Sequence, residues 1–311
     1  MPARLPAPHQ TFTSPEKFPY LEVRTTLQST LPYAEHFHAA FSFGLILDGG
    51  TCFTLKGQPH RALKGDIVLI APGLPHSCNP VDGRARSYHM AYFDAKWFAR
   101  HICRPLGIAD IYAVTKPVVR DAPLFQQGLA ALEAFCRGED NAETRFVDFF
   151  ALLQHTHACI SDAQGAGNGA VSAIDAASRL LTASSAATDQ NSPSATVLAT
   201  VLAAESAAAS AAESTLNHAP VTSLAHRAGL RRESFSRAFR RTAGLPPTAW
   251  LHCLRLEKAR ALLRQGKSIA EAALAAGYAD QSHFHRMFVK FYSVTPGCYQ
   301  RGRLHSYNTR K

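Results

Sequence analysis

Three features are missing from this sequence, and each absence excludes a class of protein or of site. Its 7 cysteines are an odd number without a Cys-x-x-Cys pair, which excludes a disulfide frame and a zinc knuckle and predicts reduced, mostly buried thiols. No apolar run is long enough to span a bilayer. The N-terminus, Met-Pro-Ala-Arg-Leu-Pro-Ala-Pro, lacks the apolar core of a signal peptide. We therefore expect a cytoplasmic protein that does not contact the membrane.

Acidic residues are scarce in the last third of the chain. Between His218 and Lys311 there are 17 Lys and Arg against 4 Asp and Glu, a net charge of +13. Residues 1–217 have 16 against 19, a net charge of −3, which together gives the +10 of the whole chain. A basic segment attached to a slightly acidic one indicates nucleic-acid binding by the C-terminal part. At 311 residues the chain is long enough for two domains with a core each.

Two similar stretches recur near the C-terminus. Each joins a helix of small residues, a glycine, and a second helix that carries two Phe residues four positions apart with an Arg between them. The stretches are Ala228-Gly229-Leu230 followed by Phe235-x-Arg237-x-Phe239, and Ala276-Gly277-Tyr278 followed by Phe284-x-Arg286-x-Phe288. Phe residues at i and i+4 share one helical face, and glycine enters φ > 0 without steric cost. Each stretch is therefore predicted to be a helix-turn-helix unit, and the second turn is one residue longer than the first.

The segment from Leu216 to Arg301 resembles the DNA-binding domain of the AraC/XylS family of bacterial transcription regulators. The run Ala-Gly-Tyr-Ala-Asp-Gln-Ser-His-Phe-His-Arg-Met-Phe, with Val-Thr-Pro after it, is similar to that family's signature. The resemblance implies an all-α domain with two helix-turn-helix units joined by a long helix, which we expect over Pro247–Arg264. Two residues depart from the pattern: Arg231 stands where a helix-capping residue is usual, and Ser293 replaces a glycine.

Candidate contacts with double-stranded DNA follow from this resemblance. Arg237 and Arg286 occupy equivalent positions in the two repeats and are the strongest base-reading candidates, since Arg pairs bidentately with guanine in the major groove. The other residues expected to face the groove are Glu233, Ser236, Gln281, Ser282 and His285. Those expected to contact phosphates are Arg231, Arg232, Arg240, Arg241 and Lys290.

The N-terminal part has the pattern of a β-sandwich or small barrel. Short runs rich in β-branched and aromatic residues are separated by turn residues, and we expect strands at Tyr20–Thr26, Phe41–Leu47, Thr51–Leu55, Asp66–Ile70 and Ser87–Phe93. The segment from Lys64 to His76 resembles a cupin turn and strand, and Glu35-His36-Phe37-His38 resembles the cupin His-x-His. Alternation in a strand would aim both imidazoles of that motif into the barrel.

A small effector is expected to bind in this barrel. The candidate effector-binding residues are His36, His38, His76, Asn79 and Tyr88. Because residues 39–44 contain no carboxylate, whereas enzymatic cupins place a Glu there, we expect no metal and no cofactor. His36, His38 and His76 remain the alternative metal ligands, since three histidines can hold zinc or iron.

Two helices and a linker separate the barrel from the basic segment. Phe125, Leu129, Leu132 and Cys136 have helical spacing, as do Phe146, Phe149, Phe150, Leu153 and Ile160. The resemblance implies that this pair forms the contact of a homodimer, and the alternative is that both helices only pack on their own barrel. Beyond residue 161 the chain is rich in Ala, Ser, Gly and Thr, which is typical of a linker.

These patterns divide the chain into six segments. We expect a disordered or extended N-terminal arm (1–17), a cupin-like ligand-sensing domain (18–121), a helical pair (122–162), a linker (163–194), a double helix-turn-helix domain (195–301) and a basic tail (302–311). The favoured function is a ligand-responsive, sequence-specific DNA-binding transcription regulator that is not an enzyme, and the resemblance allows RNA polymerase as a further partner. The alternatives are a metal-dependent cupin oxygenase or isomerase fused to a DNA-binding domain, and a ligand-independent DNA-binding protein.

Overall fold

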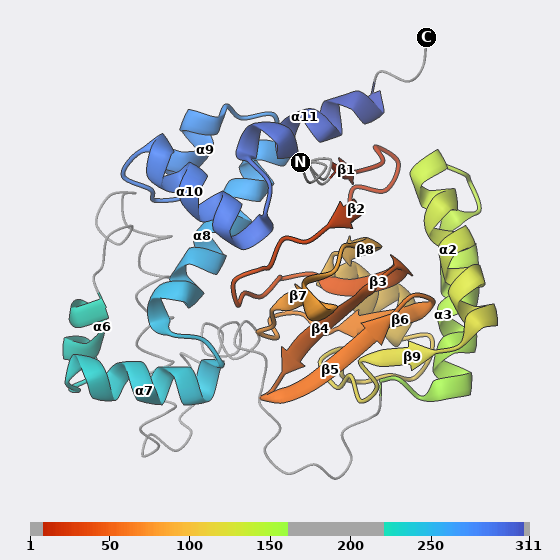
Figure 1. Ribbon diagram of the computed structural model, residues 1–311, viewed down its shortest axis with the longest axis horizontal. Helices are drawn as coiled ribbons and strands as arrows, with labels where there is room; N and C mark the ends of the chain where they lie inside the picture. Colours follow the sequence, from red (N-terminus) through yellow and green to blue (C-terminus); the bar gives the residue numbers. More distant parts are fainter. Residues whose placement is uncertain (1–8, 161–220, 308–311) are drawn as a thin grey trace, which may run out of the picture.

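The computed structural model describes residues 9–160 and 221–307, which form a β-rich domain followed by helices and then a helical domain (Figure 1). This is the fold class that the sequence predicts. The predicted linker and the start of the C-terminal domain lie outside these residues. None of the described helices has the length and apolar character needed to cross a membrane.

Residues 9–160 contain nine strands of the N-terminal domain. They are β1 (His9–Thr13), β2 (Leu21–Ser29), β3 (Phe41–Asp48), β4 (Gly50–Leu55), β5 (Gln58–Leu63), β6 (Asp66–Ile70), β7 (Cys78–Pro80), β8 (Arg86–Phe93) and β9 (Val118–Arg120). One sheet has the order β1-β2-β8-β3-β6-β9 and the other β5-β4-β7. The strands expected from the sequence correspond to β2, β3, β4, β6 and β8. The remaining four were not predicted, and β1, inside the expected N-terminal arm, pairs antiparallel with β2.

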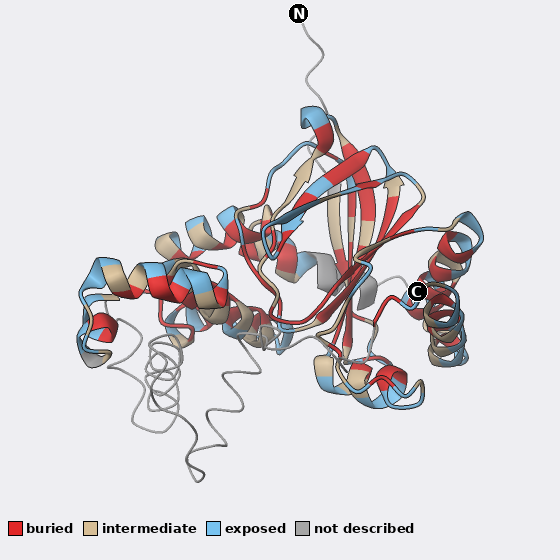
Figure 2. Cartoon of the chain, turned by 90° about the horizontal axis from the view of Figure 1, so that it is seen from below, coloured by how far each residue is buried: buried red, intermediate tan, exposed pale blue. Residues whose placement is uncertain are grey.

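The two faces of the larger sheet have different partners. On β8, the side chains of Tyr88, Met90 and Tyr92 point into the barrel, while Phe93 belongs to the core on the other face. Because strand residues alternate between faces, this assigns every second residue to the barrel interior. Figure 2 shows buried residues along the strands and exposed ones along the outer faces of the helices.

Helices α2 (Ala122–Arg137) and α3 (Ala142–His157) cover the outer face of the larger sheet (Figure 1). The Asp121 side chain caps α2 by accepting a hydrogen bond from the Leu124 backbone N–H, and Gly138 ends that helix with φ of 71°. On α3, Phe146 stacks on Phe93 of β8 with ring centroids 4.5 Å apart. The predicted helix pair is therefore present and packs on its own barrel.

Within residues 221–307 the C-terminal domain has six helices: α6 (Val221–Arg227), α7 (Arg232–Ala243), α8 (Pro247–Arg264), α9 (Ile269–Ala275), α10 (Gln281–Tyr292) and α11 (Pro296–Tyr307). Gly229 and Gly277 lie in the α6–α7 and α9–α10 turns with φ of 67° and 82°, the left-handed conformation that the sequence predicts for them. The second turn, 276–280, is one residue longer than the first, 228–231. The Phe pairs of α7 and α10 are fully buried in the domain core.

The cysteines are free thiols, as expected, but the prediction that most are buried is wrong. Cys103, Cys159 and Cys253 are buried, whereas the other four are partly or fully exposed. Cys52 is exposed because it lies on β4, where alternation turns every second side chain to solvent.

Candidate functional site

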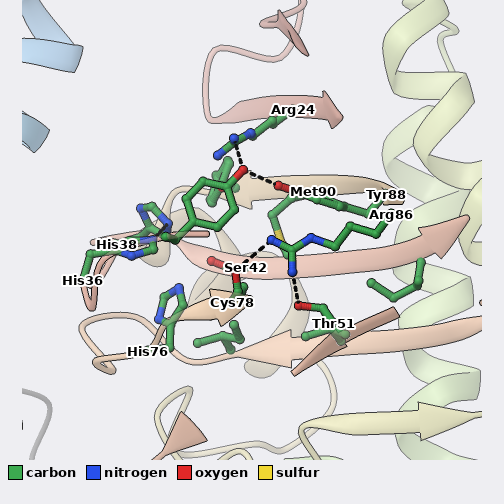
Figure 3. A pocket seen from close by; sticks show the side chains of 15 residues that line it. Arg24, His36, His38, Ser42, Thr51, His76, Cys78, Arg86, Tyr88 and Met90 are labelled. Carbon is green, nitrogen blue, oxygen red and sulfur yellow. Dashed lines mark hydrogen bonds between the residues drawn. The ribbon is translucent and has the colours of Figure 1, made fainter. Parts of the chain in front are cut away.

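The barrel encloses a small cavity near the C-terminal domain (Figure 3). The space that the centre of a water molecule can reach inside it is about 30 Å³, which is enough to hold water or a small group. Fifteen residues line it: Arg24, Tyr33, His36, His38, Ser42, Ile46, Thr51, Val68, Ile70, His76, Cys78, Arg86, Tyr88, Met90 and Tyr92. Four of the five candidate effector-binding residues are among them. The fifth, Asn79, does not line the cavity, and its side-chain oxygen accepts a hydrogen bond from the Tyr33 backbone N–H.

Three buried histidines converge at one end of this cavity (Figure 3). His36 and His76 pair through their backbones, and their rings lie 4.6 Å apart. We expected the His-x-His segment to be a strand, and the structure shows that it is not. Among the described residues its β-pairing consists of one isolated bridge between His36 and His76. Alternation nevertheless holds, since His36 and His38 face the cavity while Phe37 packs into the C-terminal domain core against Trp250.

The ring nitrogens of the histidines have defined partners. His36 Nδ1 is 2.7 Å from the Ala34 carbonyl oxygen, and His76 Nδ1 is 2.8 Å from the Leu74 carbonyl oxygen. The Nε2 atoms of His36 and His38 are 3.1 Å apart. Burial lowers the pKa of His76 to about 3, and burial also lowers the pKa values of His36 and His38. All three imidazoles are therefore neutral near pH 7.

Two buried guanidinium groups that the sequence analysis missed also line the cavity. Arg86 donates to the Thr51 hydroxyl and to the Cys78 carbonyl, each at 2.8 Å, and Arg24 donates to the Tyr33 hydroxyl. Among the described residues neither Arg forms an ion pair. Strand alternation could have found Arg86, which is two residues from Tyr88 on β8, whereas on β2 alternation with Leu21 and Val23 would place Arg24 on the solvent side.

A buried ionic cluster joins the barrel to α8. Arg260 pairs with Glu22 of β2 and donates to Glu257 at 2.8 Å, and the Glu257 carboxylate lies 3.5 Å from His38 Nδ1. Glu22 and Arg260 are only 2% and 3% exposed. Burial alone would raise the pKa of Glu257, but Arg260 and His38 hold it well below its ordinary value. Both carboxylates are therefore ionised at neutral pH, and the cavity wall is directly connected to the C-terminal domain.

Side chains from other elements close the same interface. The Tyr299 hydroxyl of α11 donates to Glu22, and the Tyr292 hydroxyl of α10 donates to Glu257 at 2.9 Å. Phe12 of β1 packs edge-on against Tyr299, with ring centroids 4.8 Å apart. Sequence reasoning could not find the contacts of Tyr299 between the domains, since Glu22 and Phe12 are each more than 200 positions from it in the chain.

The predicted DNA contacts lie on α7 and α10 or just before α7. Phe235, Phe239, Phe284 and Phe288 hold the two helices in the core, while Arg237 and Arg286 are exposed, as the repeat pattern predicts. The remaining candidates are also unburied: Glu233, Ser236, Gln281, Ser282, His285, Arg231, Arg232, Arg240, Arg241 and Lys290. Arg231 is the N-cap residue of α7 and makes no side-chain capping bond, whereas Asp280 caps α10 by accepting from the His283 N–H.

Comparisons with known proteins match both domains. A model of the AraC-like ligand-binding domain matches residues 18–148, and a helix-turn-helix domain model matches residues 224–302. YbfI, an uncharacterized HTH-type transcriptional regulator of Bacillus subtilis, is 23% identical over 81% of each chain. RclR, a transcriptional activator of Escherichia coli, is 40% identical over 26% of this chain and 28% of its own length.

A solved structure has the same two-domain fold. The crystal structure of an apo ToxT variant from Vibrio cholerae superposes with a TM-score of 0.52 at 14% identity, covering 91% of this chain and 97% of ToxT. The relatives named above are regulators, which does not favour the enzyme alternative. This chain belongs to the AraC family of ligand-responsive, DNA-binding transcription regulators.

Proposed function

We propose that occupancy of the barrel cavity controls transcription by changing how α8 is held against the barrel. The observation that supports this most directly is the chain of contacts from His38 in the cavity wall to Glu257 and Arg260 on α8. Helix α8 follows α7 and also contacts α9 and α10. A shift of this helix therefore moves both helix-turn-helix units.

The buried charges make the contact suited to switching. Separating α8 from β2 leaves the buried Glu22 carboxylate without Arg260 and Arg264 until water reaches it, so intermediate positions of α8 are unfavourable. The domains accordingly have a docked and an undocked arrangement. A ligand that binds the cavity more tightly in one arrangement shifts the population toward it.

The proposed effector is small and polar, and it contacts His36, His38, His76 and Tyr88. Ile46, Val68, Ile70 and Met90 supply apolar walls, while Arg24 and Arg86 bring positive charge without a carboxylate among the described residues. Buried charges of this kind favour a negatively charged group on what binds beside them. Asn79 takes an indirect part by holding the Tyr33 backbone.

On DNA, α7 and α10 are the proposed reading helices. Arg237 and Arg286 would read bases, together with the other groove-facing candidates, and the arginines at the ends of α7 would bind phosphates. Helix α8 has 18 residues, or about 27 Å at 1.5 Å per residue, so it can place two reading helices in successive major grooves of a bent duplex. Dimerisation through α2 and α3 is part of this proposal, and the half-exposed Leu152 of α3 is its candidate contact.

The test starts from the operator, the DNA sequence to which the protein binds specifically. Genomic footprinting with the full-length protein identifies the sites it binds, and the genes beside those sites suggest which small molecules to assay. We expect at least one such molecule to change operator affinity and, by thermodynamic reciprocity, operator DNA to change the affinity for that molecule by the same factor. The Glu257→Gln variant should retain both ligands and lose most of this coupling.

A matched control and a contrary outcome are available. Glu139→Gln removes a partly exposed carboxylate of the N-terminal domain, far from α8 in the chain, and should leave the coupling intact. If neither small molecules nor ions change thermal stability or operator affinity, the protein is a ligand-independent DNA-binding protein.

A further inference from the structure

We propose that His36, His38 and His76 form a binding site for a divalent first-row transition metal, with Zn²⁺ as the first candidate, and that Glu257 of the DNA-binding domain supports this site from the second coordination shell. The sequence ranks this alternative behind purely effector-lining histidines, and the geometry reverses the order. The regulatory part of the inference rests on the proposed function, because it makes the metal ion an effector.

The spacing of the ligand atoms fits one metal ion. One nitrogen from each histidine lies within 4.8 Å of the other two, and all three side chains are buried. Two imidazole nitrogens bound to tetrahedral zinc at 2.0–2.1 Å are separated by about 3.3 Å. The 3.1 Å between the Nε2 atoms of His36 and His38 is close to that separation.

The hydrogen bonds of the Nδ1 atoms select the tautomer that can bind a metal ion through Nε2. His36 Nδ1 and His76 Nδ1 each face a backbone carbonyl oxygen, which accepts only from a protonated nitrogen. Their Nε2 atoms therefore carry lone pairs that face inward. A histidine that binds metal through one nitrogen and donates from the other to a carbonyl or carboxylate is the usual arrangement in metal sites.

His38 supplies the strongest argument, because neither neutral tautomer suits its surroundings. With the proton on Nδ1, the Nε2 lone pair opposes the lone pair of His36 Nε2 at 3.1 Å. With the proton on Nε2, the Nδ1 lone pair opposes the Glu257 carboxylate at 3.5 Å, and His38 Nδ1 has no other hydrogen-bond partner among the described residues. A metal ion between the Nε2 atoms removes the conflict, since it leaves Nδ1–H free to donate to Glu257.

The charges around the site define its fourth ligand. Three neutral histidines leave a divalent ion with its full charge, and the open coordination position faces a cavity that Arg24 and Arg86 also line (Figure 3). These guanidiniums oppose a bare dication and favour an anion bound to it. We therefore assign the fourth position to hydroxide or to a small carboxylate, which neutralises part of the charge.

Metal binding would act on α8 through His38. Coordination fixes the His38 ring and its Nδ1–H, which can then donate to the Glu257 carboxylate 3.5 Å away and so favours the docked arrangement of the domains. The expected effect of the metal on operator affinity is roughly 5–150-fold, the usual range of coupling between two sites.

The experiment uses full-length protein stripped with a chelator and titrated with Zn²⁺ alone. We expect one Zn²⁺ per chain by calorimetry and by elemental analysis, together with a rise in the melting temperature. His36→Ala and His76→Ala should abolish stoichiometric binding. His155→Gln removes an exposed histidine of α3 and should bind as the wild type does. Because an Ala variant can fail to fold, circular dichroism is recorded for each, and Co²⁺ is bound to the wild type to report tetrahedral nitrogen ligation from its visible spectrum.

The outcomes separate the metal site from the proposed function. Folded wild-type protein that binds no Zn²⁺, Fe²⁺ or Ni²⁺ at the histidines overturns the metal site, and another ligand then acts as effector. Stoichiometric metal that leaves operator affinity unchanged overturns its role as effector. Metal-dependent operator binding that is lost in Glu257→Gln, at a Zn²⁺ concentration raised until the variant is saturated, supports both.

Discussion

On each of the two proposed DNA-reading helices, α7 and α10, some residues anchor the helix in the core and others remain exposed. On α10, Phe284 and Phe288 are fully buried, and Arg286 is exposed because two positions along a helix correspond to a rotation of about 200°, which turns its side chain away from the face that carries both Phe residues. The same holds for Arg237 on α7. The Phe residues therefore fix the helix, which leaves a guanidinium free to approach DNA in each unit.

Removing one guanidinium tests whether it reads a base. Arg286→Ala should cost about 1–3 kcal/mol of operator binding and relax specificity at a single base pair. Arg240→Ala, at the end of α7, should instead weaken binding to all sequences alike. It should also make the slope of the logarithm of the binding constant against the logarithm of the salt concentration shallower by about one. Electrophoretic mobility shifts with operator variants at several salt concentrations measure both. Equal losses on operator and random DNA for the two variants would contradict base reading by Arg286.

The two recognition helices differ at their N-terminal caps. Arg231 begins α7 without a capping bond, and Asp280 begins α10 with one. Arg231→Ser should add about 1 kcal/mol to the free energy of unfolding, while Asp280→Ala should remove about 0.5–2 kcal/mol. Urea unfolding measures these changes. Arg231→Ser should also weaken DNA binding on every sequence, so a variant that gains stability and keeps full affinity would exclude a phosphate contact at Arg231.

The helices α2 and α3 end in the same left-handed conformation with different residues. Gly138 has φ of 71° after α2, and Ala158 has φ of 46° after α3. Ala158→Gly should therefore stabilise the protein by about 0.5–1 kcal/mol, and Gly138→Ala should destabilise it by a similar amount. A methyl group at Gly138 meets no atom within 4 Å, so the effect is one of backbone conformation alone. Melting temperatures that shift in the same direction for both variants would refute this account.

Elements with strong local patterns were predictable, and edge elements were not. The strand predicted at Asp66–Ile70 matches β6. Its four consecutive apolar residues follow a Gly-Asp turn, which is a strong local signal, and all five residues of the strand are buried. Strand β5 (Gln58–Leu63) escaped prediction because it contains a Pro and lies at the edge of its sheet, where pairing with β4 alone decides its conformation. The three histidines were also found from sequence, whereas Arg86 required the alternation of β8 to be traced residue by residue, and alternation on β2 would have placed Arg24 on the solvent side.

At the scale of the whole molecule, the domain interface could not be predicted from sequence patterns. Glu22 is separated from Arg260 by 238 positions, and nothing local in either segment indicates the pairing. Arg260 lies four residues after the apolar Leu256, on the same face of α8, so its burial was within reach of sequence reasoning, but its partner was not. The regulatory proposal therefore depends on tertiary contacts, while the DNA-binding proposal depends on local repeats.

This interface predicts sensitivity to acid. Burial alone would raise the pKa of Glu22, but the Arg260 and Arg264 guanidiniums outweigh burial and hold the pKa below its ordinary value of 4.5. A carboxyl with a lowered pKa in the folded state stabilises that state fully above its unfolded pKa, and this contribution is lost as the pH falls through the folded pKa. We therefore expect the free energy of unfolding to decline below about pH 4.5.

The Glu22→Gln variant isolates this contribution from that of other carboxylates. Near pH 7 it should destabilise the protein by about 3–5 kcal/mol, because Arg260 keeps its charge in a buried site and loses a partner. The difference in unfolding free energy between wild type and variant, measured with urea, should stay constant above about pH 4.5 and narrow below it as the wild-type carboxylate takes up a proton. Glu139→Gln, which changes an exposed ion pair, should track the wild type at every pH. A difference that does not depend on pH would mean that Glu22 is not ionised at the interface, and the domains would then be held by apolar contacts such as Phe37 against Trp250.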